Sequence, residues 1–229
     1  MDVTELRERV LEANRALPAH GLVKLSSGNA SEVDRERGVM AIKASGVDYA
    51  TMGPQDVVLV DLADGTVADR QRRPSTDTPT HLGLYRALPD IGGIVHTHST
   101  YATAWAQAGR PIPVLGTTHA DFSAGPVPVT RLLSEDELAA DYEAATAGVL
   151  LEVIDEPAHT PAALVRGHAP FCWAVDAAAA VQAAVNLEQV AQLALLTVAL
   201  DAATEPLDEP LRRTHFERKH GPGAYYGQN

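Results

Sequence analysis

Two histidines separated by one residue follow a short apolar segment near the middle of the chain. The segment at residues 92–95, Gly-Gly-Ile-Val, predicts a buried strand, and His96 and His98 come at its end. Alternate side chains of a strand point to the same face, at about 3.3 Å per residue, so the two imidazoles would lie roughly 7 Å apart on that face. Zinc binds imidazole nitrogens at about 2 Å, and these rings could therefore share one divalent cation. A purely structural role at the strand end is the alternative that this pattern leaves open.

Two other candidate ligands stand at the boundaries of predicted elements. His168 follows an apolar segment at residues 162–165 that predicts a strand, and it could complete a three-histidine site with one position open to substrate. Asp77 precedes a helix predicted by the spacing of the leucines that follow it. Its carboxylate therefore either caps that helix or faces the metal on the neighbouring strand.

Three short polar segments are candidates for binding an anion. Ser27-Gly28-Asn29 and Lys43-Ala44-Ser45-Gly46 flank a hairpin predicted at residues 22–26 and 39–43, and Ser75 and Thr76 precede the helix after Asp77. Exposed backbone N–H groups, hydroxyls and a helix N-terminus suit a phosphate group. Taken alone, each of the first two segments is also typical of an ordinary turn.

Composition limits the class of protein. A chain of 229 residues, 45% of them hydrophobic, suits one α/β domain. The net charge of -12 argues against nucleic acid and anionic membranes as partners, since both need a clustered positive surface. The single Cys172 excludes an intrachain disulfide and suits a reducing cytoplasm, and the first residues carry no export signal pattern. The apolar segment at 177–200 is interrupted by amides and a glutamate, which predicts a core or interface helix rather than a membrane span.

The remaining elements are predicted from periodicity and capping. Residues 2–17 predict an amphipathic helix, residues 116–121 a polar loop that contains Asp121, and residues 134–150 a helix opened by a capping box. Asp121 by itself is typical of a solvated loop acid. The tail at 211–229 keeps two adjacent tyrosines beside histidines and glycines, which is unusual for a disordered end and predicts that it docks on the protein, including on another subunit.

Taken together, these segments resemble the L-ribulose-5-phosphate 4-epimerases of the class II aldolase/epimerase family. The resemblance runs nearly end to end and is carried by residues 27–29, 43–47, 74–81, 93–99, 116–121 and 219–228. It implies one domain over residues 1–229 of the α/β class, with three α/β/α layers and a largely antiparallel central sheet. It also implies a homotetramer with active sites between subunits and the C-terminal tail docked on a neighbour.

The resemblance also implies a role for each candidate residue. The implied metal ligands, for Zn²⁺ or alternatively Mn²⁺ or another divalent ion, are Asp77, His96, His98 and His168. The implied contacts to a ketopentose phosphate and its phosphate group are Gly28, Asn29, Lys43, Ser45, Gly46, Ser75 and Thr76. Asp121 and Tyr226 are implied as the acid/base pair, with Tyr226 from an adjacent subunit and His215 in support.

The implied reaction interconverts L-ribulose 5-phosphate and D-xylulose 5-phosphate by cleaving and rejoining the C3–C4 bond, in carbohydrate metabolism such as arabinose catabolism. Asp77 favours this epimerase over a class II aldolase that cleaves a deoxyketose 1-phosphate, because those aldolases usually carry glutamate there. A non-catalytic protein that binds metal or sugar phosphate is the remaining alternative. Three positions depart from the family pattern, namely Ala44, Thr76 and Arg166.

Overall fold

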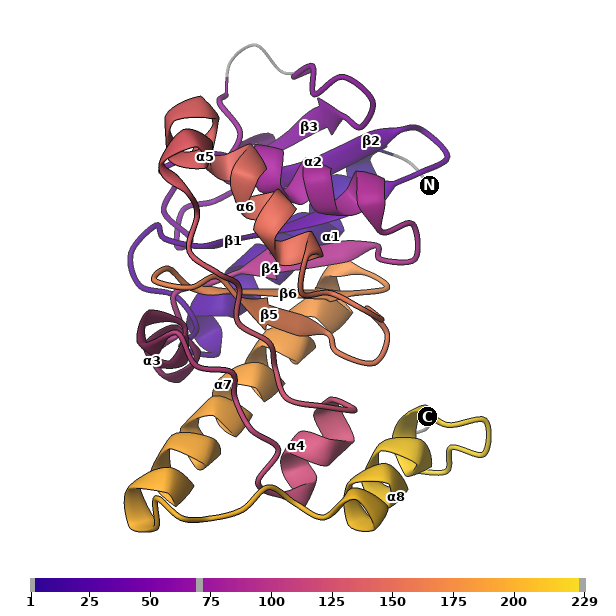
Figure 1. Cartoon of the computed structure of the whole chain (residues 1–229). Helices are drawn as coiled ribbons and strands as arrows, with labels where there is room; N and C mark the ends of the chain where they lie inside the picture. Colours follow the sequence, from indigo (N-terminus) through magenta and orange to yellow (C-terminus); the bar gives the residue numbers. More distant parts are fainter. Residues whose placement is uncertain (1–2, 69–71, 227–229) are drawn as a thin grey trace.

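The computed structural model describes residues 3–68 and 72–226 and contains one mixed α/β unit (Figure 1). Within these residues six strands form a single sheet in the order β3-β2-β1-β4-β6-β5, and every neighbouring pair is antiparallel. The strands are β1 (Asn29–Asp34), β2 (Val39–Lys43), β3 (Val57–Asp61), β4 (Gly93–His96), β5 (Ala162–Leu164) and β6 (Pro170–Ala174). The largely antiparallel sheet of the sequence prediction is confirmed.

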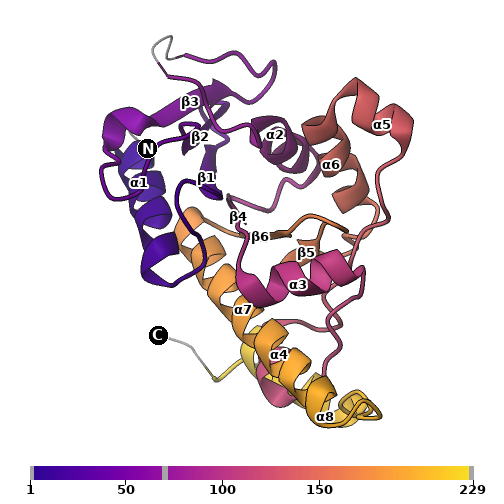
Figure 2. The ribbon, with the colours of Figure 1, turned by 90° about the vertical axis from the view of Figure 1, so that its left-hand side faces the viewer.

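Helices cover both faces of this sheet and make the three layers (Figure 2). Helices α1 (Val3–Ala19) and α7 (Ala177–Leu200) pack on one face, where the alternate strand residues Ala30, Val95 and Cys172 point. Helices α2 (Thr78–Ala87) and α6 (Tyr142–Leu151) pack on the other face, against Ile94 and Phe171. Successive residues of β4 and β6 thus pack into the hydrophobic cores on opposite faces of the sheet, because strand side chains alternate.

Helix α7 is the long apolar helix that the sequence predicts. By length and composition alone it could cross a membrane, with a mean hydropathy of 1.4. One side of the helix is instead packed on β4, β6, α1 and α3 (Thr100–Ala108), and nine of its residues are buried, from Ala177 to Ala194. This packing is what a core helix requires, with Asp176 capping its N-terminus through Ala179 N–H.

The predicted hairpin forms, but its first strand is not at residues 22–26. That segment is irregular, with Leu25 in the left-handed region (φ 57°) and 93% exposed, and β1 begins only at Asn29. The six residues of β1 are all buried although four of them are polar or acidic. Glu32 is held by Arg9 and by Ala177 N–H, so tertiary partners compensate for its burial.

Two further segments differ from the prediction. Residues 116–121, predicted as a loop, form most of the short helix α4 (Thr117–Phe122). The capping box at Ser134 opens α5 (Glu135–Ala140) as predicted, but Asp141 adopts an extended backbone and starts the separate helix α6. The tail forms α8 (Glu209–His220), which packs on α4 of the same chain, whereas its docking on a neighbouring subunit stays a prediction.

Candidate active site

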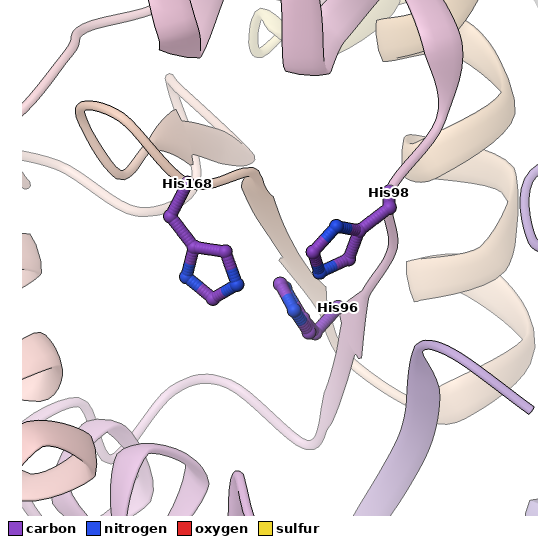
Figure 3. Close-up of side chains that lie close together, drawn as sticks. All are labelled: His96, His98 and His168. Carbon is purple, nitrogen blue, oxygen red and sulfur yellow. The ribbon is translucent and has the colours of Figure 1, made fainter.

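The three predicted histidine ligands converge at one end of the sheet (Figure 3). His96 is the last residue of β4, His98 follows it in the loop before α3, and His168 lies in the turn between β5 and β6. One ring nitrogen of each lies within 4.8 Å of the others. Burial of His96, partial burial of His168 and exposure of His98 leave one side of the cluster open. This donor set fits a divalent cation with an open position.

A hydrogen bond at the back of the His96 ring favours the tautomer that a metal ligand needs, and a second contact holds the His168 ring. His96 Nδ1 lies 2.9 Å from the carbonyl oxygen of Pro170, which can only accept, so Nδ1 carries the proton and Nε2 keeps its lone pair. Tyr142 Oη lies 3.0 Å from His168 Nδ1 and can orient that ring. Burial lowers the pKa of both histidines below the ordinary value, which keeps the rings neutral and able to coordinate.

Asp77 occupies the N-cap position of α2, but its side chain makes no capping hydrogen bond. Its carboxylate instead accepts from Asn29 Nδ2 at 2.6 Å and from Ser75 Oγ at 3.3 Å. The capping alternative is therefore wrong. Asp77 and the three histidines line the same cavity, although Asp77 is not part of the three-nitrogen cluster.

A cavity of about 430 Å³ opens beside the histidines and has predominantly polar walls. It is lined by every residue predicted to bind metal or substrate, namely Gly28, Asn29, Lys43, Ser45, Gly46, Ser75, Thr76, Asp77, His96, His98 and His168. Segments separated by up to 140 positions in sequence, from Gly28 to His168, therefore meet at one place. Their roles in binding remain predictions, but their shared location is a property of the fold.

The part of the cavity wall that contains Lys43 suits an anion. Lys43 is buried, and its polar contacts are two long hydrogen bonds of 3.4 Å to the carbonyl oxygens of Ser26 and Ala44. Burial lowers the pKa of Lys43, while Asp48, Asp56 and Asp77 act at longer range to raise it. Within the described residues no carboxylate pairs with its ammonium group, so the charge is available to a ligand.

Backbone hydrogen bonds join the two phosphate-binding candidates on this wall. Ser45 N–H donates to Arg73 O, Ser75 N–H donates to Lys43 O, and Ala44 pairs with Pro74 in an isolated bridge. Ala44, one of the departures from the family pattern, keeps the extended pairing at this point and is buried. The side chain of Arg166, another departure, lies against Gly109 and does not line the cavity.

Asp121 and Tyr226 do not line this cavity. Asp121, on α4, accepts from Arg218 Nη2 at 2.6 Å and from Arg218 Nε at 3.0 Å, and it pairs with His215 at 3.1 Å. The guanidinium of Arg218 also lies 4.3 Å from the ring centre of Tyr226. Burial acts to raise the pKa of Asp121, but the hydrogen bonds from Arg218 and His215 outweigh it and hold that pKa below its ordinary value. Asp121 and Tyr226 thus form one cluster with α8.

Sequence reasoning missed several residues of these two sites. Tyr142 and Glu143 line the cavity from the start of α6, and Arg218 is the centre of the Asp121 cluster. Tyr142 and Glu143 fall inside a segment that periodicity treats only as helix, and Arg218 lies in a basic stretch of a tail. No spacing pattern in the sequence indicates their partners, which lie 26 positions away for Tyr142 and 97 for Arg218.

An antiparallel sheet between two helical layers, with three histidines at one end of the sheet, defines the architecture of this chain. A family model described as the Class II Aldolase and Adducin N-terminal domain matches residues 8–195. The chain belongs to the class II aldolase family.

Similar proteins within the family have a narrower description than the family model. L-ribulose-5-phosphate 4-epimerase UlaF of Salmonella paratyphi B is 52% identical over 226 residues, which cover 98% of this chain and 99% of the relative. The protein of the same description from Salmonella typhi is 51% identical with the same coverage. The resemblance predicted from the sequence is confirmed.

Solved structures support the fold. An L-fuculose 1-phosphate aldolase superposes with a TM-score of 0.80 at 24% identity, over 95% of this chain and 97% of the aldolase. An L-fuculose 1-phosphate aldolase from Glaciozyma antarctica PI12 gives 0.77 at 23% identity, over 96% and 84% of the two chains. At this sequence identity the comparison shows a common fold, and the reaction has to be inferred from the residues of the site.

Proposed function

We propose that this chain is a metal-dependent epimerase that interconverts L-ribulose 5-phosphate and D-xylulose 5-phosphate. The observation that carries the proposal is the single cavity that joins the three-histidine cluster, Asp77 and the Lys43 wall. A phosphorylated sugar that spans this cavity places its phosphate at the cationic wall and its reacting carbons at the histidines. Full-length relatives at 52% identity that are described as L-ribulose-5-phosphate 4-epimerases support this choice of substrate.

The chemistry of carbon 4 dictates the kind of catalyst. The hydrogen on C4 is not acidic, since C4 is not adjacent to the ketone, so simple deprotonation cannot invert this carbon. Cleavage of the C3–C4 bond, rotation of the aldehyde fragment and rejoining on its other face can. The C4 hydroxyl must lose a proton on cleavage and regain one on rejoining, which requires a proton-transferring group on each side of the aldehyde.

The three histidines would hold the divalent cation, with Asp77 beside it. When bound, this cation supplies a Lewis acid for negative charge that develops on the substrate oxygens. Lys43 and the hydroxyls of Ser45 and Ser75 would retain the phosphate of the departing fragment, so that it rotates without leaving the cavity. We propose Zn²⁺, with Mn²⁺ or another divalent ion as the alternative, because three imidazoles and a carboxylate accept each of these ions.

Asp121 and Tyr226 are the proposed acid/base pair. Both belong to the α4–α8 cluster of their own chain, which does not line the cavity, so we propose that a neighbouring subunit brings both together to each cavity. A homotetramer with active sites between subunits supplies such a neighbour. We also propose that the enzyme acts in the cytoplasm, in line with its single buried cysteine.

The direct test incubates the metal-loaded protein with L-ribulose 5-phosphate and follows the sugar phosphates by NMR. Accumulation of D-xylulose 5-phosphate without free aldehyde supports the epimerase. Cleavage of a deoxyketose 1-phosphate, with no epimer formed, would move the protein to the aldolases. Absence of both reactions would leave a protein that only binds metal or sugar phosphate.

The sharing of the site between subunits has its own test by complementation. The variants His98→Asn and Asp121→Asn are each expected to be inactive as homo-oligomers, because every site lacks one component. Hybrids formed by unfolding and refolding the two variants together contain some cavities with His98 and a neighbour with Asp121. Recovered activity in the hybrids supports the arrangement, and hybrids as inactive as both parents contradict it.

A further inference from the structure

A buried tyrosine outside the cavity touches both halves of its anion-binding wall. Tyr49 follows β2 in the chain, is 5% exposed, and is absent from the cavity lining. Its hydroxyl reaches the segment that contains Gly28, and its ring faces Lys43. No feature of the sequence distinguishes this tyrosine from an ordinary core residue.

The hydroxyl of Tyr49 fixes the backbone of the Ser27-Gly28 segment. Tyr49 Oη lies 2.7 Å from Gly28 O and 3.0 Å from Ser27 O, and both acceptors are carbonyls, so the tyrosine must donate. Burial raises the pKa of Tyr49 above the ordinary tyrosine value, so the hydroxyl keeps its proton in solutions near neutrality. Because the peptide unit is planar, fixing these two carbonyls also fixes the N–H groups of Gly28 and Asn29.

The same segment is confined from its other side. Gly28 has a φ of +78°, and a Cβ at this position would lie 2.8 Å from the carbonyl oxygen of His96. The segment is therefore held between Tyr49 and the strand that carries the metal ligands. A shift of the segment away from Tyr49 would change the cavity wall at Gly28 and Asn29.

The ring of Tyr49 acts on the second half of the wall. Lys43 Nζ lies 4.8 Å from the ring centre, within the range of a cation–π interaction. This contact favours the charged ammonium at a buried position where, among the described residues, no carboxylate pairs with it. It leaves the ammonium free to meet an incoming anion, which a carboxylate partner would not.

We propose that Tyr49 is a positioning residue for phosphate binding, which aligns the Ser27-Gly28 segment with Lys43 without touching the substrate. The inference rests on the proposed function, because it assumes that the Lys43 wall receives the phosphate. It assigns to one side chain the alignment of two segments that are otherwise 14 positions apart, from Asn29 to Lys43.

The test uses Tyr49→Phe in the full-length, metal-loaded protein, with Tyr85→Phe as the matched control. Tyr85 is also buried, and its replacement by phenylalanine removes the hydrogen bond of its hydroxyl with Ser31 Oγ at 2.9 Å. Tyr85 and Ser31 do not line the cavity. Calorimetric titration with inorganic phosphate gives Kd, steady-state kinetics with L-ribulose 5-phosphate give KM and kcat, and thermal unfolding confirms the fold. Both variants keep the ring and its volume, so we expect both to fold.

We expect Tyr49→Phe to raise the phosphate Kd and KM about tenfold, as for the loss of one well-placed hydrogen bond, with kcat and metal content near the wild-type values. Tyr85→Phe should leave the phosphate Kd, KM, kcat and metal content unchanged. Replacement of Tyr49 by 4-aminophenylalanine, which restores an N–H donor on the ring, should recover most of the phosphate affinity.

The outcomes separate this inference from the function on which it rests. A wild-type protein that neither binds phosphate nor epimerises the sugar overturns the proposed function and the inference with it. A wild-type protein that does both, with phosphate Kd and KM unchanged in Tyr49→Phe, overturns only the role of Tyr49. Equal increases of phosphate Kd and KM in Tyr49→Phe and Tyr85→Phe would also overturn that role, since they would reflect general loosening of the core.

Discussion

Gly28 lies between the cavity wall and β4, the strand that ends at the candidate metal ligand His96, and replacing Gly28 with alanine should damage both. A Cβ at this position would lie 2.8 Å from the carbonyl oxygen of His96 and 2.8 Å from Val23 Cγ1. Real Cβ atoms do not approach other atoms so closely, so the backbone of one of the two segments must move. His96 is paired with Asn29 on β1 and with Phe171 on β6, so it can yield little without disturbing the sheet.

The expected cost has two parts. Alanine in the left-handed conformation costs roughly 1–2 kcal/mol, and an extra carbon forced into a packed site costs about 1–3 kcal/mol. Gly28→Ala should therefore lower the free energy of unfolding by about 2–5 kcal/mol. A displaced His96 should also weaken metal binding about tenfold or more, as for other changes that misorient a ligand.

Gly38→Ala provides the matched control. Gly38 has a φ of +66° in the turn between β1 and β2, but no atom lies within 4 Å of the position its Cβ would take. It should cost only the conformational part, about 1–2 kcal/mol, and leave metal affinity unchanged. Urea unfolding of the metal-free proteins and competition with a chelator for Zn²⁺ measure the two quantities. Equal losses of stability in both variants, with wild-type metal affinity in Gly28→Ala, would refute the proposed contact between the segment and His96.

Three other perturbations have defined outcomes. Chelation of the metal should reduce turnover roughly 100-fold or more, and an unchanged rate after complete chelation contradicts metal dependence. Added Zn²⁺ at 100 times its Kd should raise the unfolding free energy by about 2.7 kcal/mol. Tyr142→Phe should weaken metal binding about tenfold by freeing the His168 ring, and chelator competition that finds wild-type affinity removes this role. Arg218→Met should let the pKa of Asp121 rise toward its ordinary value and should move the acid limb of the pH–rate profile to higher pH. The control Arg213→Met, at an exposed arginine that pairs with Glu209, should leave the profile in place. Identical profiles for both variants contradict a role of the Arg218–Asp121 pair in setting the pKa of Asp121.

The depressed pKa of Asp121 also makes a prediction for stability. A carboxyl whose pKa is lower in the folded state stabilises the fold above its unfolded value of 3.8, and this contribution is lost as the pH falls through the folded value. The unfolding free energy of the wild type should therefore exceed that of Asp121→Ala at neutral pH, with a difference that narrows below pH 3.8. Equilibrium unfolding at a series of pH values measures this, and a constant difference would show that packing, not charge, dominates.

Local sequence pattern was sufficient to predict the three-histidine cluster and insufficient for the elements built on polar residues. The strand before His96 and the period-two spacing to His98 could be predicted because apolar, β-branched residues define that strand. Residues 29–34 of β1 carry polar and acidic side chains that only distant partners make tolerable, as Arg9 does for Glu32. The hydrophobic pattern therefore led to a prediction of the first hairpin strand in the more apolar segment at 22–26.

The same reason explains the errors near the acid/base candidates. The segment that forms α4 is polar and short, so sequence reasoning predicts a loop, and its helical form is packed against α8 almost 100 positions later. Asp121 looks like a solvated acid until Arg218 and His215 are placed beside it. The family resemblance predicted the importance of Asp121 and Tyr226, but only the structure shows that they lie together outside the cavity of their own chain.

The most direct measurement uses L-ribulose 5-phosphate carrying deuterium at C4, with the metal-loaded protein in ordinary water. Cleavage and rejoining of the C3–C4 bond never breaks the bond from C4 to its hydrogen. We predict that NMR and mass spectrometry will show D-xylulose 5-phosphate that retains the deuterium, and that chelation of the metal will stop its formation. Loss of the deuterium to water during epimerisation, or no epimer at all, would contradict the central claim.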